Sequence, residues 1–299
     1  MSKTESRPFF IVGSQRSGTT MLRLMINMHS RLCVPFESAF IVEFFNKRDV
    51  YGDLSEKRNV EAMLDAIVEH SYVKKGNLIA DKREILSAPI TDYASLLAAI
   101  FEAYARNAGK ARWGDKTPRY VTDIDVLVKL FPGCKIIHVV RDGRDVALSL
   151  RALSWGTKHV PRLAQEWRWK TLLAHKMGSL LGDDYLEVRY EDLVLKSEDT
   201  LRCICSFLSE DFQPAMLDYS ESAKSEMPTE SMAYHSTSVK PPDESKVFKW
   251  ETGMSAADQT LYEHSARDAL DQFGYKLMNR PSTIASKVKS LYYSLIVRW

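Results

Sequence analysis

Apolar runs that stop at glycine or proline alternate with helical periodicities along this chain. Residues 9–12 are continuously apolar and stop at Gly13, a pattern typical of a buried central strand. Apolar residues then recur at helical spacing from Met21 to Met28. A strand, a glycine loop and a helix in this order predict an α/β unit at the beginning of the chain.

The same reasoning predicts the other elements. We expect strands at 32–38, 111–116, 135–141 and 185–189. We expect helices at 54–71, 91–107, 123–131, from near Val146, and at 160–181, 197–208 and 256–272, and a long surface loop at 214–249. Strands separated by helices predict a three-layer α/β domain with helical insertions, whose central, mostly parallel sheet has about five strands. Ligands of such a sheet bind at the carboxyl ends of its strands.

Composition excludes several classes of protein. Of the 299 residues, 45% are hydrophobic and 27% charged, which is typical of a globular domain. The net charge of +2 argues against a nucleic-acid partner. The four cysteines have no paired spacing, so we expect no metal site and no disulfide framework, with Cys203 and Cys205 as buried thiols. No leader and no long apolar run is visible, so we expect a cytoplasmic protein.

The first loop has the geometry of a phosphate cradle. Gly13 and Gly18 have the spacing of a P-loop, and a helix N-terminus follows them, so the expected fold is P-loop-like. The lysine of that motif is absent, since Thr19 follows Gly18 and the cation lies earlier, at Arg16. This departure weakens an ordinary ATPase or GTPase interpretation.

Charged residues follow the ends of several predicted strands. Arg16, Glu37, Lys116 and the segment 141–149 should converge at one edge of a parallel sheet. Two basic groups, one carboxylate and a phosphate nest suit the transfer of an anionic group to a deprotonated nucleophile. Taken singly, Glu37 is equally typical of a cap or turn, and Lys116 of an exposed lysine beside a turn.

Two motifs in combination resemble the sulfotransferases that use 3′-phosphoadenosine 5′-phosphosulfate (PAPS). Arg16-Ser-Gly-Thr-Thr20 is similar to the 5′-phosphosulfate loop of that family. Arg141 and Ser149 keep the spacing of the arginine and serine that bind the 3′-phosphate there. The alternative for the Arg-Asp-x-Arg-Asp cluster at 141–145 is a solvated network of ion pairs.

Three further segments resemble the bacterial, tyrosylprotein and carbohydrate branch of this family. They are Trp113 to Pro118, Val188 to Leu193, and Ser236 to Lys240 followed by Lys249-Trp250. The serine of the last segment stays open, because Ser236, Thr237 and Ser238 all compete. The resemblance spans residues 8–276, and we expect residues 1–279 to form one sulfotransferase domain.

The resemblance implies that a sulfuryl group moves from PAPS to a hydroxyl or amine by in-line displacement, without a metal. The implied cofactor-binding residues are Arg16, Ser17, Gly18, Thr19, Thr20, Arg141, Ser149, Tyr190, Ser236 and Lys240. Arg16 also binds the bridging or leaving oxygen, Glu37 is the base, and Lys116 stabilises the transferred group or acts as an acid. Rivals for the base are Glu43 and, because other family members use histidine, His29, His138 and His159, although His138 lies within a strand.

Other hypotheses stay open. An atypical P-loop kinase or other NTP-binding protein would share the glycine loop, and so would a non-catalytic nucleotide-binding module. The acceptor is not readable, since its walls should come from residues 40–110, 151–170 and 214–245. Aromatic residues in these segments suit a small-molecule, carbohydrate or lipid acceptor equally.

Residues 280–299 form a basic amphipathic tail with four cations and no acidic residue. Such a tail suits peripheral contact with an anionic membrane. The plainer alternative is a helix packed on the domain or on a second subunit of a homodimer.

Overall fold

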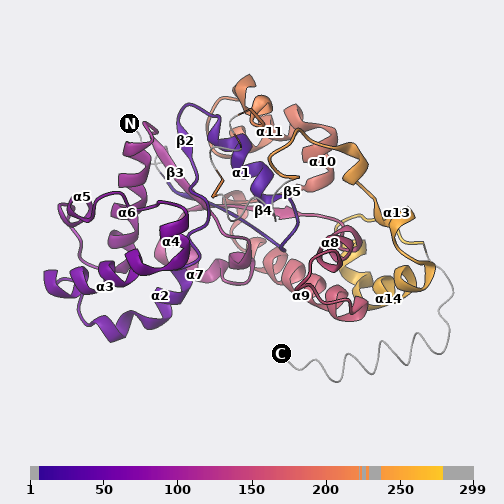
Figure 1. Cartoon of the computed structure of the whole chain (residues 1–299), viewed down its shortest axis with the longest axis horizontal. Coiled ribbons are helices and arrows are strands. Elements are labelled where there is room, and N and C mark those ends of the chain that lie inside the picture. Colours follow the sequence, from indigo (N-terminus) through magenta and orange to yellow (C-terminus); the bar gives the residue numbers. More distant parts are fainter. Residues whose placement is uncertain (1–6, 222, 224–226, 229–236, 279–299) are drawn as a thin grey trace.

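A parallel five-stranded sheet forms the centre of the computed structural model, which describes residues 7–221, 223, 227–228 and 237–278 (Figure 1). The strands are β1 (Phe9–Gly13), β2 (Leu32–Cys33), β3 (Arg112–Lys116), β4 (Lys135–Val140) and β5 (Tyr185–Arg189). Their order in the sheet is β2-β3-β1-β4-β5, and every pair is parallel. The predicted α/β fold class is confirmed.

The central strand β1 pairs with both β3 and β4. Gly13 lies opposite Val139, so β1 and β4 end nearly level and their following loops start side by side. Gly114 on β3 lies beside Phe9, whose ring would be 2.5 Å from a Cβ atom at this position. Glycine is therefore required there for the close approach of the two strands.

Side chains alternate between the two faces of the sheet. Phe10 and Val12 face one core, which is shared with the helices inserted between β2 and β3. Phe9 and Ile11 face the other core, together with helices that follow β1 and β5. A third core beyond the end of β4 unites the helices near the C-terminal side of the described chain.

Helices cover both faces and build the insertion (Figure 1). The inserted helices are α2 (Ile41–Lys47), α3 (Lys57–Glu69), α4 (Ser71–Lys75), α5 (Lys82–Leu86) and α6 (Tyr93–Asn107). The others are α1 (Thr19–Asn27), α7 (Ile124–Leu130), α8 (Gly143–Arg151), α9 (Val160–Gly178), α10 (Tyr190–Leu195), α11 (Ser197–Phe207), α13 (Trp250–Gly253) and α14 (Ala256–Gln272). Short 3₁₀ turns lie at Arg48–Tyr51, Pro118–Thr122, Gly182–Asp184, Pro214–Asp218 and Glu244–Lys246.

Most predicted elements lie within a few residues of the observed ones, and three differ. The second strand stops at Cys33, because Pro35 lacks the N–H that a continuing ladder needs. Helix α8 begins three residues before Val146, because the Asp142 side chain caps it by accepting from the Arg144 amide at 2.9 Å.

The third difference concerns residues 214–249, which are not simply a surface loop. Tyr219 in this segment is fully buried, and Met216 and Val239 join the second core. The expectation for the cysteines is also partly wrong, since Cys205 is buried but Cys203 is exposed. All four cysteines are free thiols.

Two sequence-based predictions lie outside the described residues, namely the role of Ser236 and the C-terminal tail 280–299. Within the described part of the chain, no helix combines the length and the apolar character needed to cross a membrane.

Candidate active site

A cavity of about 700 Å³ opens at the carboxyl edge of the sheet. Its walls come from the loops after β1, β2, β3 and β4, from α4 and α10, and from the late segment 237–249. Seven basic and three acidic residues of the described chain line it: Arg16, Lys75, Arg119, Arg141, Lys240, Lys246 and Lys249, with Glu37, Asp145 and Asp243. The excess of positive charge favours an anionic ligand.

The glycine loop reaches the cavity through two left-handed residues. Arg16 has φ 70° and Gly18 has φ 92°, which turns the chain sharply into α1. A Cβ atom at Gly18 would lie 2.4 Å from the Tyr190 ring, so only glycine fits there. Ser17 is fully buried, and its amide donates to the Ser14 carbonyl at 3.2 Å. Gly18, Thr19 and Thr20 line the cavity.

Arg16 and Arg141 lie together at the bottom of this loop. The Arg16 Nε atom donates to the Ser149 hydroxyl at 2.9 Å, and Arg141 donates to the Arg16 carbonyl at 3.1 Å. Burial, and next the charge of Arg141, lower the pKa of Arg16. Two guanidinium groups held this close repel each other, and a bound anion would relieve that repulsion.

Tyr190 supports the same arginine. The Arg141 guanidinium carbon lies 4.3 Å from the centre of the Tyr190 ring, a cation–π contact, and Tyr190 itself lines the cavity. Arg141 Nε is buried without a hydrogen-bond partner among the described residues. Arg141 is thus held in place by aromatic and backbone contacts, and part of its donor capacity is unused.

Glu37 and Lys116 form an ion pair beside the loop. Lys116 Nζ lies 2.5 Å from Glu37 Oε1 and 3.3 Å from Thr20 Oγ1, which links the carboxylate to the first turn of α1. Burial lowers the pKa of Lys116, while the neighbouring carboxylate of Glu37 opposes this effect. Glu37 lines the cavity, whereas Lys116 is fully buried beneath it.

A buried cluster behind Glu37 fixes the segment that carries it. The Ser38 amide donates to Asp115 Oδ1 at 3.3 Å, and the Ile41 amide donates to the Tyr120 hydroxyl at 2.8 Å. Asp115 is fully buried, and burial raises its pKa to about 6. These contacts tie the residues after Glu37 to the end of β3.

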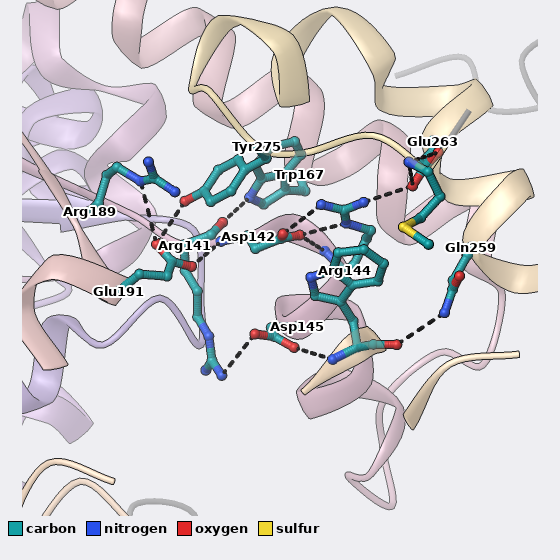
Figure 2. Close-up of polar contacts among 12 residues, drawn as sticks. Arg141, Asp142, Arg144, Asp145, Trp167, Arg189, Glu191, Gln259, Glu263 and Tyr275 are labelled. Carbon is teal, nitrogen blue, oxygen red and sulfur yellow. Dashed lines mark hydrogen bonds and ion pairs between the residues drawn. The ribbon is translucent and has the colours of Figure 1, made fainter. Parts of the chain in front are cut away.

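A second buried network lies under α8 (Figure 2). Arg144 contacts Asp142 at 2.8 Å and Glu263 at 2.7 Å, and its guanidinium stacks on Trp250 at 3.4 Å. Arg144 and Asp142 are both fully buried. The alternative of a solvated network at residues 141–145 is therefore wrong, since this network lies in the interior.

The late segment is bound to the same network. The Arg141 guanidinium donates to the Lys246 carbonyl at 2.8 Å. The Trp250 amide donates to Asp145 at 2.8 Å (Figure 2). The Tyr219 hydroxyl donates to the Lys240 carbonyl, which connects this segment to the second core. The late segment thereby forms one wall of the cavity.

Most residues that the sequence singled out gather at this cavity. Those that line it are Arg16, Gly18, Thr19, Thr20, Glu37, Arg141, Ser149, Tyr190 and Lys240. Ser17 and Lys116 lie behind its wall. Thr237 and Ser238, the other candidates for the late serine, both line it.

The rival bases lie elsewhere. Glu43 is on α2 and pairs with Lys47 at 2.8 Å, outside the cavity lining. His29 and His138 are fully buried, and His159 precedes α9 without reaching the cavity wall. His138 lies within β4, as the sequence predicted.

Several lining residues were missed in the sequence. Asp145, Lys246, Lys249 and Arg119 also line the cavity. Two of them had a sequence signal: Asp145 is the last member of the Arg-Asp-x-Arg-Asp cluster, and Lys249 belongs to the Lys249-Trp250 pair of the family-like segment. The described residues contain no group of three or more side chains suited to hold a metal ion.

Comparison with known proteins identifies the family. The model of the sulfotransferase family matches residues 8–214. A protein-tyrosine sulfotransferase of Drosophila melanogaster is 25% identical over 71% of this chain and 40% of its own length. The nodulation protein NoeE of Sinorhizobium fredii is 28% identical over 50% of this chain and 32% of its own length.

Solved structures agree with this result. The sulfotransferase domain of the Synechococcus PCC 7002 olefin synthase superposes with a TM-score of 0.65 and 26% identity, covering 91% of this chain and 97% of that domain. The sulfotransferase domain from the curacin biosynthetic pathway shares the fold, with a TM-score of 0.61, 22% identity and coverage of 91% and 99%. The chain spans less than half the length of the full-length relatives above. It belongs to the sulfotransferase family.

Proposed function

We propose that this protein transfers a sulfuryl group from PAPS to a hydroxyl or amine of a small-molecule, carbohydrate or lipid acceptor. The observation that carries the proposal is the adjacency of the glycine loop to the Arg16, Arg141 and Ser149 cluster. It provides two neighbouring anion sites in one positively charged cavity. A nucleotide with phosphates on the 5′ and 3′ positions of its ribose fits two such sites.

The residues present fit this cofactor. Gly18, Thr19 and Thr20 would hold the 5′-phosphate at the N-terminus of α1. Arg141, whose Nε atom is buried without a hydrogen-bond partner in the part of the chain that the structure describes, and Ser149 would hold the 3′-phosphate. Tyr190 and Lys240, which line the cavity, would complete the cofactor site. When bound, PAPS supplies an activated sulfuryl group and a stable leaving phosphate.

The chain's own residues would supply the proton transfer and charge stabilisation. Glu37 lines the cavity and would accept the acceptor's proton at its carboxylate. Lys116, 2.5 Å from Glu37 and linked to Thr20, would stabilise negative charge where the glycine loop and the acceptor meet. Arg16 would stabilise the charge that develops on the leaving oxygen. Tyr72, Lys75 and Trp155 line the remaining walls, where we place the acceptor.

Calorimetric titration with adenosine 3′,5′-bisphosphate (PAP), the product nucleotide, tests the cofactor assignment. Adenosine 5′-monophosphate (AMP) and ATP with Mg²⁺ serve as comparison ligands. We expect PAP to bind at least about a hundredfold more tightly than AMP, because charge-assisted contacts to the 3′-phosphate contribute roughly 1.5–3 kcal/mol each. A preference for ATP with Mg²⁺ would instead establish the kinase hypothesis.

A further inference from the structure

Asp145 differs from the other carboxylates of the cavity in being buried. It is 2% exposed, and its Oδ1 atom accepts from the Trp250 amide at 2.8 Å. Its Oδ2 atom is buried without a hydrogen-bond partner in the described structure and lies 3.8 Å from Arg141 Nη2 (Figure 2). One oxygen of a cavity-lining carboxylate therefore accepts no hydrogen bond from the described residues and has only an ion pair with the arginine that we assign to the 3′-phosphate.

The groups around Asp145 determine the pKa of its carboxyl group. Burial raises its pKa to about 6, with Asp142 acting in the same direction, while Arg141 and the amides of Trp250 and Phe248 oppose the shift. Tyr190 faces it from α10. The other charged groups that line the same cavity from the loops and the late segment are Arg16, Asp243, Lys246 and Lys249.

We propose that Asp145 takes up a proton from water when a 3′-phosphate binds to Arg141, and returns it when the nucleotide leaves. This inference rests on the proposed function. The phosphate forms an ion pair with Arg141, which neutralises the positive charge beside Asp145. It also brings two negative charges close to the carboxylate. Both effects favour the protonated form.

The protonated carboxyl group of Asp145 then helps to bind the nucleotide. Its Oδ2–H becomes a donor for a phosphate oxygen, while Oδ1 still accepts from the Trp250 amide. The ionised form repels the phosphate and so weakens the hold on the product. Asp145 thereby determines how strongly the 3′-phosphate contributes to affinity, and makes that contribution depend on pH.

Proton uptake during PAP binding is the measurement that tests this. Calorimetry at pH 7.5 in two buffers of different ionisation enthalpy gives the number of protons taken up. We expect uptake of at least about 0.2 of a proton per PAP, rising toward one proton, since a nearby dianion shifts a carboxyl pKa upward by one to three units from about 6. The 3′-phosphate has a second pKa of about 6, so it is already dianionic and contributes little. AMP lacks this group and should bind without proton uptake.

Asp145→Asn separates the carboxyl group from every other source of protons. The amide keeps an acceptor for Trp250 and a permanent donor for the phosphate, so this variant should take up no proton. It should bind PAP about tenfold more tightly at pH 7.5, the factor that corresponds to one pKa unit. Asp243→Asn is the matched control, because Asp243 lines the same cavity but its side chain is half exposed.

The outcomes are distinguishable. Wild-type protein that binds PAP without proton uptake, or uptake that persists in Asp145→Asn, overturns the role of Asp145 and leaves the proposed function intact. Wild-type protein that does not bind PAP overturns both. The comparison of PAP with AMP on wild-type protein tests the inference even if the variant does not fold.

Discussion

Glu37 is the residue on which the proposed chemistry depends most. It lies after a two-residue strand, in a segment whose position is fixed by Asp115 and Tyr120 and not by regular structure. Its carboxylate is 15% exposed, enough to meet an acceptor while Lys116 holds one of its oxygens. Lys116, which pairs with Glu37, also contacts Thr20 and so connects the carboxylate to the glycine loop.

Replacing Glu37 by glutamine should remove the base and preserve the shape of the site. We expect Glu37→Gln to lower kcat by a factor of about 10²–10⁴, the usual contribution of a general base, with the Kd for PAP within about threefold of wild type. The readout is PAPS turnover with an acceptor found by screening. Glu43→Gln is the control, because Glu43 pairs with Lys47 outside the cavity. Full turnover by Glu37→Gln would remove Glu37 from the mechanism.

Motif spacing predicted that these residues gather at one edge of the sheet, because strand ends of a parallel sheet converge wherever the intervening helices go. It could not predict which of them are buried. Lys116 lies beneath the cavity wall, and Asp145, a member of the charged cluster at 141–145, is 2% exposed. The burial of Asp145 depends on residues 250–263, which pack over this cluster from far along the chain.

At the scale of elements, α8 connects the cavity to helices α13 and α14. Its first residue, Gly143, lies against Trp167 and Tyr262 so closely that a Cβ atom would be 2.1 Å from the Tyr262 hydroxyl. Arg144 then binds Asp142 and Glu263 in the interior. The close packing at Gly143 and the ion pairs of Arg144 thus fix the first turn of α8, directly after Arg141 and Asp142.

Arg144→Ala should be strongly destabilising, because it leaves two buried carboxylates without their cation. We expect the free energy of unfolding to fall by about 3–5 kcal/mol and Tm by roughly 10 °C. Thermal unfolding by circular dichroism measures this. Arg168→Ala removes an ion pair whose two side chains are about half exposed, with Asp268, and should cost less than about 1 kcal/mol. Equal losses in the two variants would contradict the structural role of the buried network.

On the scale of the whole molecule, a polar cluster ties the sheet to the helical layer. Glu187 on β5 accepts from His175 on α9 at 2.9 Å and from the Tyr185 hydroxyl at 2.8 Å. Although burial alone would raise it, the nearby His138 together with hydrogen bonds from His175 and Tyr185 holds the pKa of Glu187 at about 2. Since Tyr185 donates to Glu187, it must accept from His138 Nδ1–H at 2.7 Å.

This cluster should make stability depend on pH on the acid side. The folded-state pKa of Glu187 lies below its unfolded value of about 4.3, so its contribution is present above that pH and is lost as pH falls toward 2. We expect Glu187→Gln to lower stability by about 1–2 kcal/mol at pH 7 and by much less near pH 3. Urea unfolding at both pH values tests this. Glu198→Gln, which breaks only the pair with Arg202 within α11, should cost about 0.5 kcal/mol or less.

The global architecture was largely readable from the sequence, since buried parallel strands are short apolar runs with clear stops. The segment 214–249 was not. Its polar composition predicts a surface loop, yet Tyr219 and Val239 are buried, and the adjoining Trp250 packs on Arg144. These contacts are made with residues more than a hundred positions away or with other layers, which local periodicity cannot report.

The pairing of β1 with β4 has a consequence for ligand choice. The glycine loop and Arg141 follow the ends of these two adjacent strands, which lie about 4.8 Å apart at a separation set by backbone hydrogen bonds. In the complex with PAPS that we propose, this fixed separation would determine how far apart the 5′-phosphate and 3′-phosphate positions lie.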